Sequence, residues 1–179
     1  MADLLIESFY NPSQFLRQYY YLSELSRLQG NFPYGDVEHS FFVACQRRQE
    51  SSPPKSNEKD QIIGFVDVDA RPRKKESDAP RPYLSDLAVI PAHRRKGVAQ
   101  ALIRECETEA KLWGKDELYL RVERDNDGGL KMYKDKLGYE ALDHHYFGVK
   151  DTTILLRRRF NEAIEEKTTS EKVEADYII

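Results

Sequence analysis

The sequence predicts an α+β (mixed α/β) fold, in which helices flank a single central, mostly antiparallel sheet. Three observations carry this prediction. Short stretches alternate in polarity as strands do, two long charged loops separate three consecutive strand candidates, and one long amphipathic helix follows the third of them. The expected order is strand, helix, three strands, helix, strand, helix, strand, strand, which is a one-sheet arrangement.

The N-terminal part holds the first strand and the first helix of this order. Leu4–Tyr10 is short enough for a strand, although two of its apolar residues also have helical spacing, and we interpret it as the strand. Ser13 is a suitable N-cap for the helix that follows, whose apolar residues run to Leu25. The next strand candidate is His39–Gln46.

Two more strands complete a consecutive set of three. Ile62–Ala70 alternates, and one of its faces turns polar towards its end, whereas Tyr83–Val89 is the third strand. Charged loops at 47–61 and 71–82 join the three. Strands that follow one another in this way pair as an antiparallel meander.

A long helix is expected over Gly97–Trp113, because apolar residues recur on one of its faces, and Gly114 is well placed as its C-terminal cap residue. The remaining elements are a strand, a short helix closed by Gly138 and two further strands, at Leu118–Val122, Gly129–Lys136, Tyr139–Leu142 and Thr153–Arg158.

Length and composition set the outer limits. With 179 residues, 40% hydrophobic and 33% charged, the chain fits one domain over 1–160, followed by a charged tail over 161–179 that is either helical or disordered. The net charge of -3 and the pI of about 5.9 give no overall attraction to nucleic acid or membrane. No apolar run approaches the ~20 residues that cross a bilayer.

The cysteines and the N-terminus bear on the compartment and on metals. Cys45 and Cys106 have no CxxC spacing, so we expect reduced thiols and no metal site. The N-terminus lacks the pattern of a signal peptide. We therefore expect a soluble intracellular, cytoplasmic protein, or a plastid one if a transit peptide lies upstream of Met1.

The turn after Val89 has the features of an anion site. Arg94, Arg95 and Lys96 bring positive charge to the start of the long helix, where free N–H groups and the helix dipole attract anions, and Gly97 lets a ligand approach the backbone. A pyrophosphate fits this arrangement, whereas the Walker and Rossmann patterns are absent. Taken alone, the turn is equally consistent with a solvated basic loop.

Two motifs together carry a specific resemblance. Leu87-Ala88-Val89-x-Pro91-x-x-Arg94-Arg95-Lys96-Gly97-Val98-Ala99 resembles the acetyl-CoA signature [RQ]-x-x-G-x-[GA] of the GNAT superfamily of N-acetyltransferases. Asn126-Asp127-Gly128-Gly129-Leu130-Lys131-Met132-Tyr133 resembles the N-x-x-[AG]-x-x-[LMF]-Y of that superfamily, and Gly138-Tyr139 resembles the Gly-aromatic pair that follows it. The resemblance covers about residues 83–142 and extends to members that act on protein N-termini or lysines and to plastid-type members.

The resemblance implies a role for each matching residue, with acetyl-CoA as co-substrate. The backbone of Leu87, Ala88 and Val89 would pair with the pantetheine arm as an extra strand pairs with a sheet edge. Asn126 would bind near the thiol end, and Tyr133 would be the general acid, because a phenol of pKa ~10 can donate to a developing thiolate. The pyrophosphate would be held by Arg94, Arg95, Lys96, Gly97, Val98, Ala99 and Gln100.

The sequence departs from the pattern in its helix. Gly128-Gly129 lowers helix propensity by up to ~1 kcal/mol per residue, so we expect a helix that starts late or is loosely held. Lys134–Leu137 puts four residues between Tyr133 and Gly138, one more than is common in the family. The end of this helix is therefore expected to be wound differently.

A further departure concerns the general base. Some members that act on protein N-termini carry Glu where this chain has Arg121. Glu123, on the same strand face, or Asp86 could substitute, as could a chain of water molecules. Ordinary surface or salt-bridged roles for both acids remain open.

The resemblance implies direct transfer of an acetyl group from acetyl-CoA to a primary amine, with a protein N-terminus or lysine as the expected acceptor and no nucleic acid, membrane or metal partner. Within the enzyme class, the alternative acceptors are a polyamine, an arylalkylamine or an aminoglycoside. A non-catalytic acyl-CoA-binding domain is the alternative from another class. A monomer or a homodimer is expected.

Overall fold

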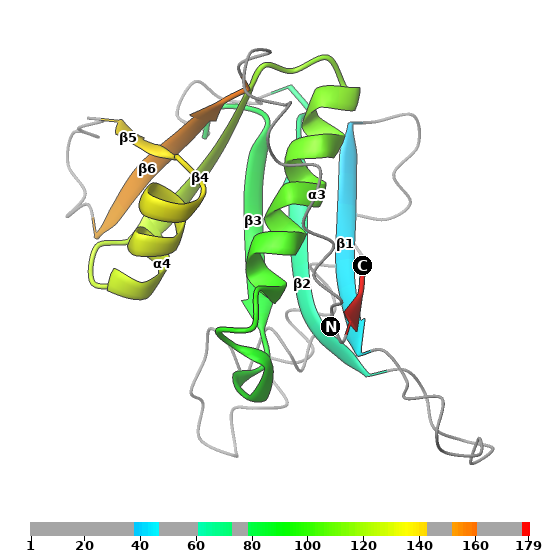
Figure 1. Cartoon of the computed structure of the whole chain (residues 1–179). Helices are drawn as coiled ribbons and strands as arrows, with labels where there is room; N and C mark the ends of the chain where they lie inside the picture. Colours follow the sequence, from blue (N-terminus) through cyan, green and yellow to red (C-terminus); the bar gives the residue numbers. More distant parts are fainter. Residues whose placement is uncertain (1–37, 47–60, 73–78, 143–151, 161–176) are drawn as a thin grey trace, which may run out of the picture.

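A computed structural model describes residues 38–46, 61–72, 79–142, 152–160 and 177–179. Its sheet has seven strands in the order β5-β6-β4-β3-β2-β1-β7, and only the β3–β4 pair is parallel (Figure 1). The expected fold class is confirmed. The strands are β1 (His39–Gln46), β2 (Ile62–Asp69), β3 (Tyr83–Val89), β4 (Glu117–Glu123), β5 (Glu140–Leu142), β6 (Thr153–Arg159) and β7 (Tyr177–Ile178).

The ends of the chain bear on three expectations. The strand at Leu4–Tyr10 and the helix that begins after Ser13 lie outside the described residues, as does most of the tail. Within the expected tail, Tyr177–Ile178 pair with β1 as strand β7, and the expectation of a helical or disordered tail stays a prediction for residues 161–176. The domain boundary at residue 160 stays a prediction.

The predicted meander is confirmed. β1 pairs antiparallel with β2 from His39↔Asp69 to Cys45↔Ile62, and β2 pairs antiparallel with β3. Every residue from Ile63 to Asp69 is buried, so β2 is the central strand of this half of the sheet. Strands that are buried on both faces need not alternate, which is why the alternation of β2 is only partial.

The long helix α3 (Val98–Leu112) lies across β2 and β3 on one face of the sheet (Figure 1). Its apolar side buries Leu102 and Ile103 completely against the sheet. Gly64 on β2 permits the close approach, because a Cβ there would stand 2.9 Å from Cδ1 of Leu102. The helix ends as expected, with Gly114 in the left-handed conformation at φ 71°.

A bulge divides β3 into two parts. Ser85 pairs with Asp67 and Ala88 pairs with Phe65, so two residues of β3 oppose one residue of β2, and Asp86 has a φ of 56°. A bulge bends its strand and increases the local twist. On its other side, β3 pairs with β4 at one position only, Tyr83↔Tyr119, so the two strands separate beyond the bulge.

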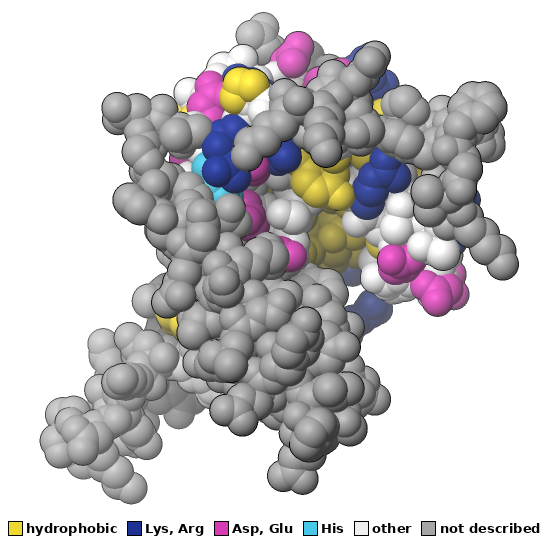
Figure 2. All heavy atoms as spheres, turned by 180° about the vertical axis from the view of Figure 1, so that it is seen from behind, with side chains coloured by type: hydrophobic (Ala, Val, Ile, Leu, Met, Phe, Trp, Pro, Cys, Tyr) yellow, Lys and Arg dark blue, Asp and Glu magenta, His cyan; other side chains and the backbone are white. Residues whose placement is uncertain are grey.

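The face of the sheet opposite α3 carries buried charges. Nε2 of His39 lies 2.8 Å from Oδ1 of Asp67, and both residues are buried. Asp69 accepts a bidentate pair from Arg71 and an ion pair of 2.9 Å from Arg81. The polar end expected for β2 is therefore a set of paired groups, and Figure 2 shows basic and acidic side chains bordering hydrophobic ones on this face.

The second helical segment differs from its expected form. α4 (Asp127–Lys131) begins two residues before the predicted start, so the expectation of a late start is wrong. It continues directly into a π-helical turn, η2 (Met132–Lys136), in which the N–H of Leu137 donates to the carbonyl of Met132 at 3.2 Å. The predicted irregular winding is this π turn, and Gly138 closes it at φ 70°.

The described residues contain no helix that is both long and apolar enough to cross a membrane. Both cysteines are free thiols, and Cys106 is fully buried in the core as expected.

Candidate functional site

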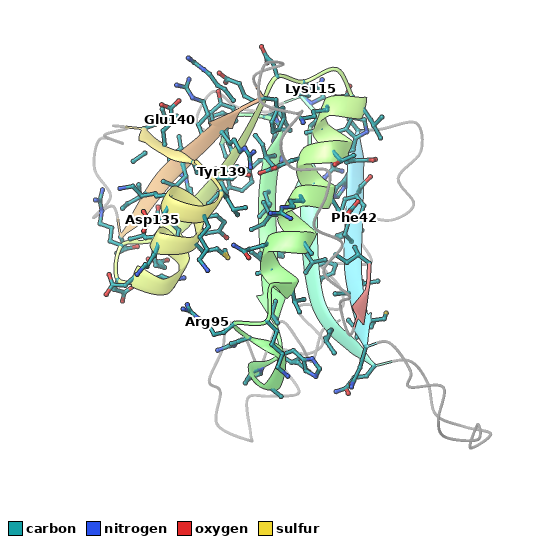
Figure 3. All side chains as sticks on the ribbon, in the orientation of Figure 1. Phe42, Arg95, Lys115, Asp135, Tyr139 and Glu140 are labelled. Atoms are coloured by element: carbon teal, nitrogen blue, oxygen red, sulfur yellow. The ribbon has the colours of Figure 1, made fainter. Side chains whose placement is uncertain are left out.

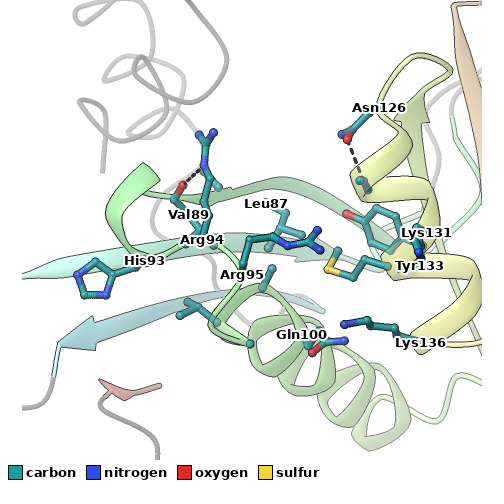
Figure 4. A pocket seen from close by; sticks show the side chains of 17 residues that line it. Leu87, Val89, His93, Arg94, Arg95, Gln100, Asn126, Lys131, Tyr133 and Lys136 are labelled. Carbon is teal, nitrogen blue, oxygen red and sulfur yellow. Dashed lines mark hydrogen bonds between the residues drawn. The ribbon is translucent and has the colours of Figure 1, made fainter.

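A cavity of about 500 Å³ lies where β3 and β4 separate. Two segments line it, as Figure 4 shows. We call Leu87–Gln100 the first wall and Asn126–Lys136 the second wall. The first wall consists of the end of β3, a turn and the start of α3, and the second wall consists of α4 and η2 with the capping residue before them.

The first wall bends sharply before α3. After the short helix η1 (Pro91–His93), Nε of Arg94 donates to the carbonyl of Val89 at 3.0 Å and ties the turn to its strand. Arg95 and Gly97 then have φ values of 65° and 85°, in the left-handed region that Gly adopts without strain. The turn therefore needs Gly97 for its backbone conformation.

The start of α3 presents free backbone donors. Gly97 provides no side-chain cap, and the helical ladder begins with the N–H of Ala101 donating to the Gly97 carbonyl at 3.0 Å. The N–H groups of Val98, Ala99 and Gln100 precede that bond and have no partner within the helix. Together with the helix dipole, they form a site for an anion.

The end of β3 offers an open strand edge. Because β3 pairs with β4 only at Tyr83, the β4 side of Leu87–Val89 has no ladder to β4. An extended chain of alternating amide donors and acceptors can pair with such an edge. The carbonyl of Val89 on this edge already accepts from Nε of Arg94.

On the second wall, Asn126 caps α4. Its Oδ1 accepts from the N–H of Gly129 at 2.9 Å. A Cβ on Gly129 would lie 2.8 Å from Nδ2 of Asn126, whereas one on Gly128 would lie 3.9 Å from Oδ1. Gly129 thus leaves room for the capping side chain, which explains a glycine that helix propensity disfavours.

Tyr133 projects from the second wall into the cavity (Figure 4) and is 7% exposed. Burial raises the pKa of its phenol far above the ordinary value of 10.0, and the neighbouring Cys106 and Tyr83 add to the rise. The phenol therefore stays protonated near neutral pH and is a proton donor rather than a base.

Tyr139 holds Tyr133 in place through its ring and its backbone. The ring of Tyr139 meets that of Tyr133 edge-on at 5.8 Å, and the N–H of Tyr139 donates to the carbonyl of Tyr133 at 2.9 Å. The Tyr139 hydroxyl donates to Oε1 of Glu107 on α3 at 3.0 Å, and Arg158 contacts the same oxygen at 2.9 Å. Glu107 thus links α3 to Tyr139, which packs against Tyr133 of the second wall.

The cavity is positively charged. The described residues that line it include Arg94, Arg95, Lys131 and Lys136 and no Asp or Glu. Figures 3 and 4 show Arg95 directed from the turn towards the second wall. A cavity lined by one sign of charge concentrates ligands of the opposite sign.

The structure brings together most of the residues that the sequence predicts for the site. The predicted residues that line the cavity are Leu87, Ala88, Val89, Arg94, Arg95, Gly97, Val98, Ala99, Gln100, Asn126 and Tyr133. Three others do not line it. Lys96 is exposed on the turn, Asp86 lies in the bulge of β3, and Glu123 is exposed at the end of β4.

Sequence reasoning missed several lining residues. They are His93, Gly128, Gly129, Lys131, Met132 and Lys136. Five of the six belong to the second wall, where only Asn126 and Tyr133 were predicted. The extra residue between Tyr133 and Gly138 was the one signal that this wall is wound differently.

The residues fit coenzyme A. The free donors of α3 and the basic side chains suit its phosphates, the open edge of β3 suits the amides of its pantetheine arm, and Tyr133 lies on the opposite wall. Among the described residues, no group of three or more His, Cys, Asp or Glu side chains could hold a metal ion.

Comparisons with known proteins agree with this arrangement. GCN5-related N-acetyltransferase 10, chloroplastic, of Arabidopsis thaliana is 30% identical over 108 residues, which are 56% of this chain and 41% of that protein. The N-terminal acetyltransferase complex ARD1 subunit homolog of Dictyostelium discoideum is 22% identical over 119 residues, which are 65% of this chain and 57% of that protein. The matches thus span less than two thirds of either relative.

A solved structure shares the fold. The PaiA N-acetyltransferase from Thermoplasma acidophilum, solved in complex with coenzyme A, matches with a TM-score of 0.56 at 20% identity, over 89% of this chain and 90% of that one. Residues 3–139 match the sequence profile of the acetyltransferase (GNAT) family. This match covers most of the chain and includes both motifs and both walls of the cavity, and the chain therefore belongs to the GNAT family of acetyltransferases.

Proposed function

We propose that the chain transfers the acetyl group of acetyl-CoA directly to a primary amine of a protein, at an N-terminus or a lysine side chain. One observation carries the proposal. A single positively charged cavity holds a backbone anion site on the first wall and the buried phenol of Tyr133 on the second. The two sites match the charged end and the reacting end of this donor.

From an ammonium group, the reaction removes two protons from the nitrogen and supplies one proton to the sulfur. An ammonium group has no lone pair, so the amine loses a proton before its nitrogen attacks the thioester carbon. The new C–N bond forms as the C–S bond breaks, the nitrogen releases its second proton to water, and the sulfur leaves as a thiolate. Tyr133 gives its phenolic proton to that sulfur.

The raised pKa of Tyr133 is compatible with this role. The transfer moves one negative charge from sulfur to oxygen within the same desolvated site. Burial therefore disfavours both anions, and it penalises the thiolate before the transfer as well as the phenolate after it. A protonated Tyr133 is also neutral, so it does not repel the developing thiolate.

Glu123 and Asp86 remain the candidates for the base that takes the amine proton, together with a chain of water molecules. They lie on β4 and β3, the two strands that separate at the cavity, although neither lines it. A base outside the lining would act through water. The Arg121 that replaces the acid of some relatives donates to Oγ1 of Thr153 at 3.3 Å.

The protein acceptor is supported by the name of the Dictyostelium relative, a homologue of a subunit of an N-terminal acetyltransferase complex. The name of the Arabidopsis relative supports a plastid location as an alternative to the cytoplasmic one. Imaging of the full-length gene product fused to a fluorescent protein distinguishes the two compartments.

Tyr133→Phe tests the role of the phenol. We expect kcat to fall about 10²- to 10⁴-fold, which is the usual contribution of a positioned general acid, with little change in KM for acetyl-CoA. Thioester-dependent release of CoA measures both. Tyr119→Phe is the matched control, because its hydroxyl donates to Glu117 on β4 and the residue does not line the cavity. An unchanged kcat in Tyr133→Phe would remove this residue from its role.

The same assay identifies the acceptor. A peptide library with free N-termini, N-terminally blocked peptides containing Lys, and a polyamine are offered in turn, and mass spectrometry locates the acetyl group. Acetylation of the polyamine alone would replace the protein acceptor. CoA binding without turnover of any amine would favour a non-catalytic binding domain, and absence of acetyl-CoA binding in calorimetry would overturn the whole proposal.

A further inference from the structure

The second wall brings two lysines into the cavity that neither family motif assigns. Lys131 ends α4 and Lys136 ends η2, and both line the cavity. Figure 4 shows Lys136 extending towards the start of α3, where Gln100 lies. The second wall therefore carries positive charge opposite the free donors of α3.

The position of Lys136 follows from the π turn. Tyr133, Leu137 and Tyr139 are between 3% and 7% exposed, so the core fixes both ends of η2. The extra residue between them must be taken up in the exposed stretch Lys134–Lys136, and a π turn is how a helix accommodates one additional residue. The turn leaves Lys136 in the lining and Lys134 outside it.

The two lysines have no acidic neighbours in the lining. Among the described residues, neither Lys131 nor Lys136 forms an ion pair, and the lining contains no carboxylate. Four cationic side chains around one cavity repel one another unless an anion is bound. A neutral pantetheine arm alone would not balance the charge of these four side chains.

We propose that Lys136, assisted by Lys131, binds a phosphate of the nucleotide part of coenzyme A, so that the phosphates are held between the two walls. This inference rests on the proposed function for the identity of the ligand. The start of α3 binds the phosphates through backbone donors, and Lys136 neutralises them from the opposite side. The thioester then lies deeper, between the open edge of β3 and Tyr133.

Lys136→Gln, with Lys134→Gln as its matched control, tests the inference. The control changes the same residue type on the same turn, two positions away and outside the lining. We expect Lys136→Gln to weaken binding of CoA about tenfold in calorimetry, which is typical of a lost charge-assisted hydrogen bond, and Lys134→Gln to stay within about twofold. The kcat/KM for S-acetylpantetheine, which has no phosphate, should be the same in all three proteins.

Dephospho-CoA and adenosine 3′,5′-bisphosphate show which phosphate is bound. An equal loss for CoA and dephospho-CoA in Lys136→Gln assigns the lysine to the diphosphate. A loss confined to CoA and the bisphosphate assigns it to the 3′-phosphate. Either result supports the inference.

Three results would overturn it. CoA affinity could be unchanged in Lys136→Gln, both glutamine variants could lose affinity equally, or S-acetylpantetheine could lose as much as CoA. If CoA binding depends on Lys136 but no amine is acetylated, the inference holds and the proposed function fails. If the wild-type protein binds no CoA, both fail.

Discussion

The two walls of the cavity are built in opposite ways. The first wall leads into the 15-residue helix α3, which buries Val98, Leu102, Ile103, Cys106 and Ala110 against the sheet. The second wall is a five-residue helix without a buried residue, followed by a π turn whose one buried residue is Tyr133. Local stability depends on buried contacts, so the second wall is the less firmly held of the two.

The two walls contribute different kinds of chemical group to the cavity. The first wall contributes backbone groups, whose positions are set by a regular helix and a strand. The second wall contributes side chains, whose positions depend on a cap, a glycine and the contact of Tyr139 with Glu107. Substitutions in the first wall should therefore act on donor binding through the backbone, and those in the second wall through the placement of single side chains.

The largest effect is expected from Gly97→Val. A β-branched residue at φ 85° is strained by about 1–3 kcal/mol, and relief of that strain would move the donors at the start of α3. We expect acetyl-CoA affinity to fall by about tenfold or more in calorimetry. Gly114→Val, at φ 71° with no atom within 4 Å of a new Cβ, should lower the melting temperature and leave the affinity unchanged. Equal affinities for the two variants would contradict the role of the first wall.

An intermediate effect is expected from Gly129→Ala. The new Cβ would displace the side chain of Asn126, which costs about 0.5–2 kcal/mol of capping, while alanine regains up to about 1 kcal/mol of helix propensity. The melting temperature should change little, and KM for acetyl-CoA should rise several-fold. Gly128→Ala keeps the cap and should raise the melting temperature slightly without a change in KM. Equal changes of KM in Gly129→Ala and Gly128→Ala would contradict a role of the Asn126 cap in binding acetyl-CoA.

The smallest effect is expected at the contact that joins the walls. Burial raises the pKa of Glu107 above its ordinary value of 4.5, although Arg158 and Tyr139 oppose the rise. A raised pKa in the folded state means that the stability contributed by this group is complete below about pH 4.5 and is lost as the pH rises through the folded pKa. The glutamine side chain in Glu107→Gln cannot ionise, so this variant should not lose stability in that way as the pH rises.

The melting temperature of Glu107→Gln, relative to the wild type, should therefore increase as the pH is raised from about 4 to about 7. Differential scanning calorimetry across this range measures it. The other titrating groups are common to both proteins, so the difference isolates Glu107. A constant difference would show that the ionised carboxylate is fully compensated by its partners.

The walls also differ in how far the sequence predicts them. β3, α3 and the cap at Gly114 follow from local patterns, because alternation, helical periodicity and a glycine stop are properties of neighbouring residues. The second wall depends on distant contacts. Propensity alone predicts a late helix start, yet Asn126 caps the helix across the glycines, and Lys136 reaches the cavity because the core fixes Leu137 and Tyr139.

The same limit applies to the opposite face of the sheet. The alternation of β2 predicts a polar end, but it cannot show that Asp67 and Asp69 are buried beside His39 and Arg81, which come from other segments. Pairing partners far apart in the chain are not encoded in a local pattern.

The single register pair between β3 and β4 has a thermodynamic consequence. It leaves the sheet as two smaller sheets, β7-β1-β2-β3 and β4-β6-β5, which share one position of a ladder. A donor that pairs with the open edge of β3 and touches the second wall would connect them, and a ligand that binds only the folded state adds about 2.7 kcal/mol of stability at 100 times its Kd. The cellular concentration of the donor would then influence the stability of the folded protein as well as its rate of turnover.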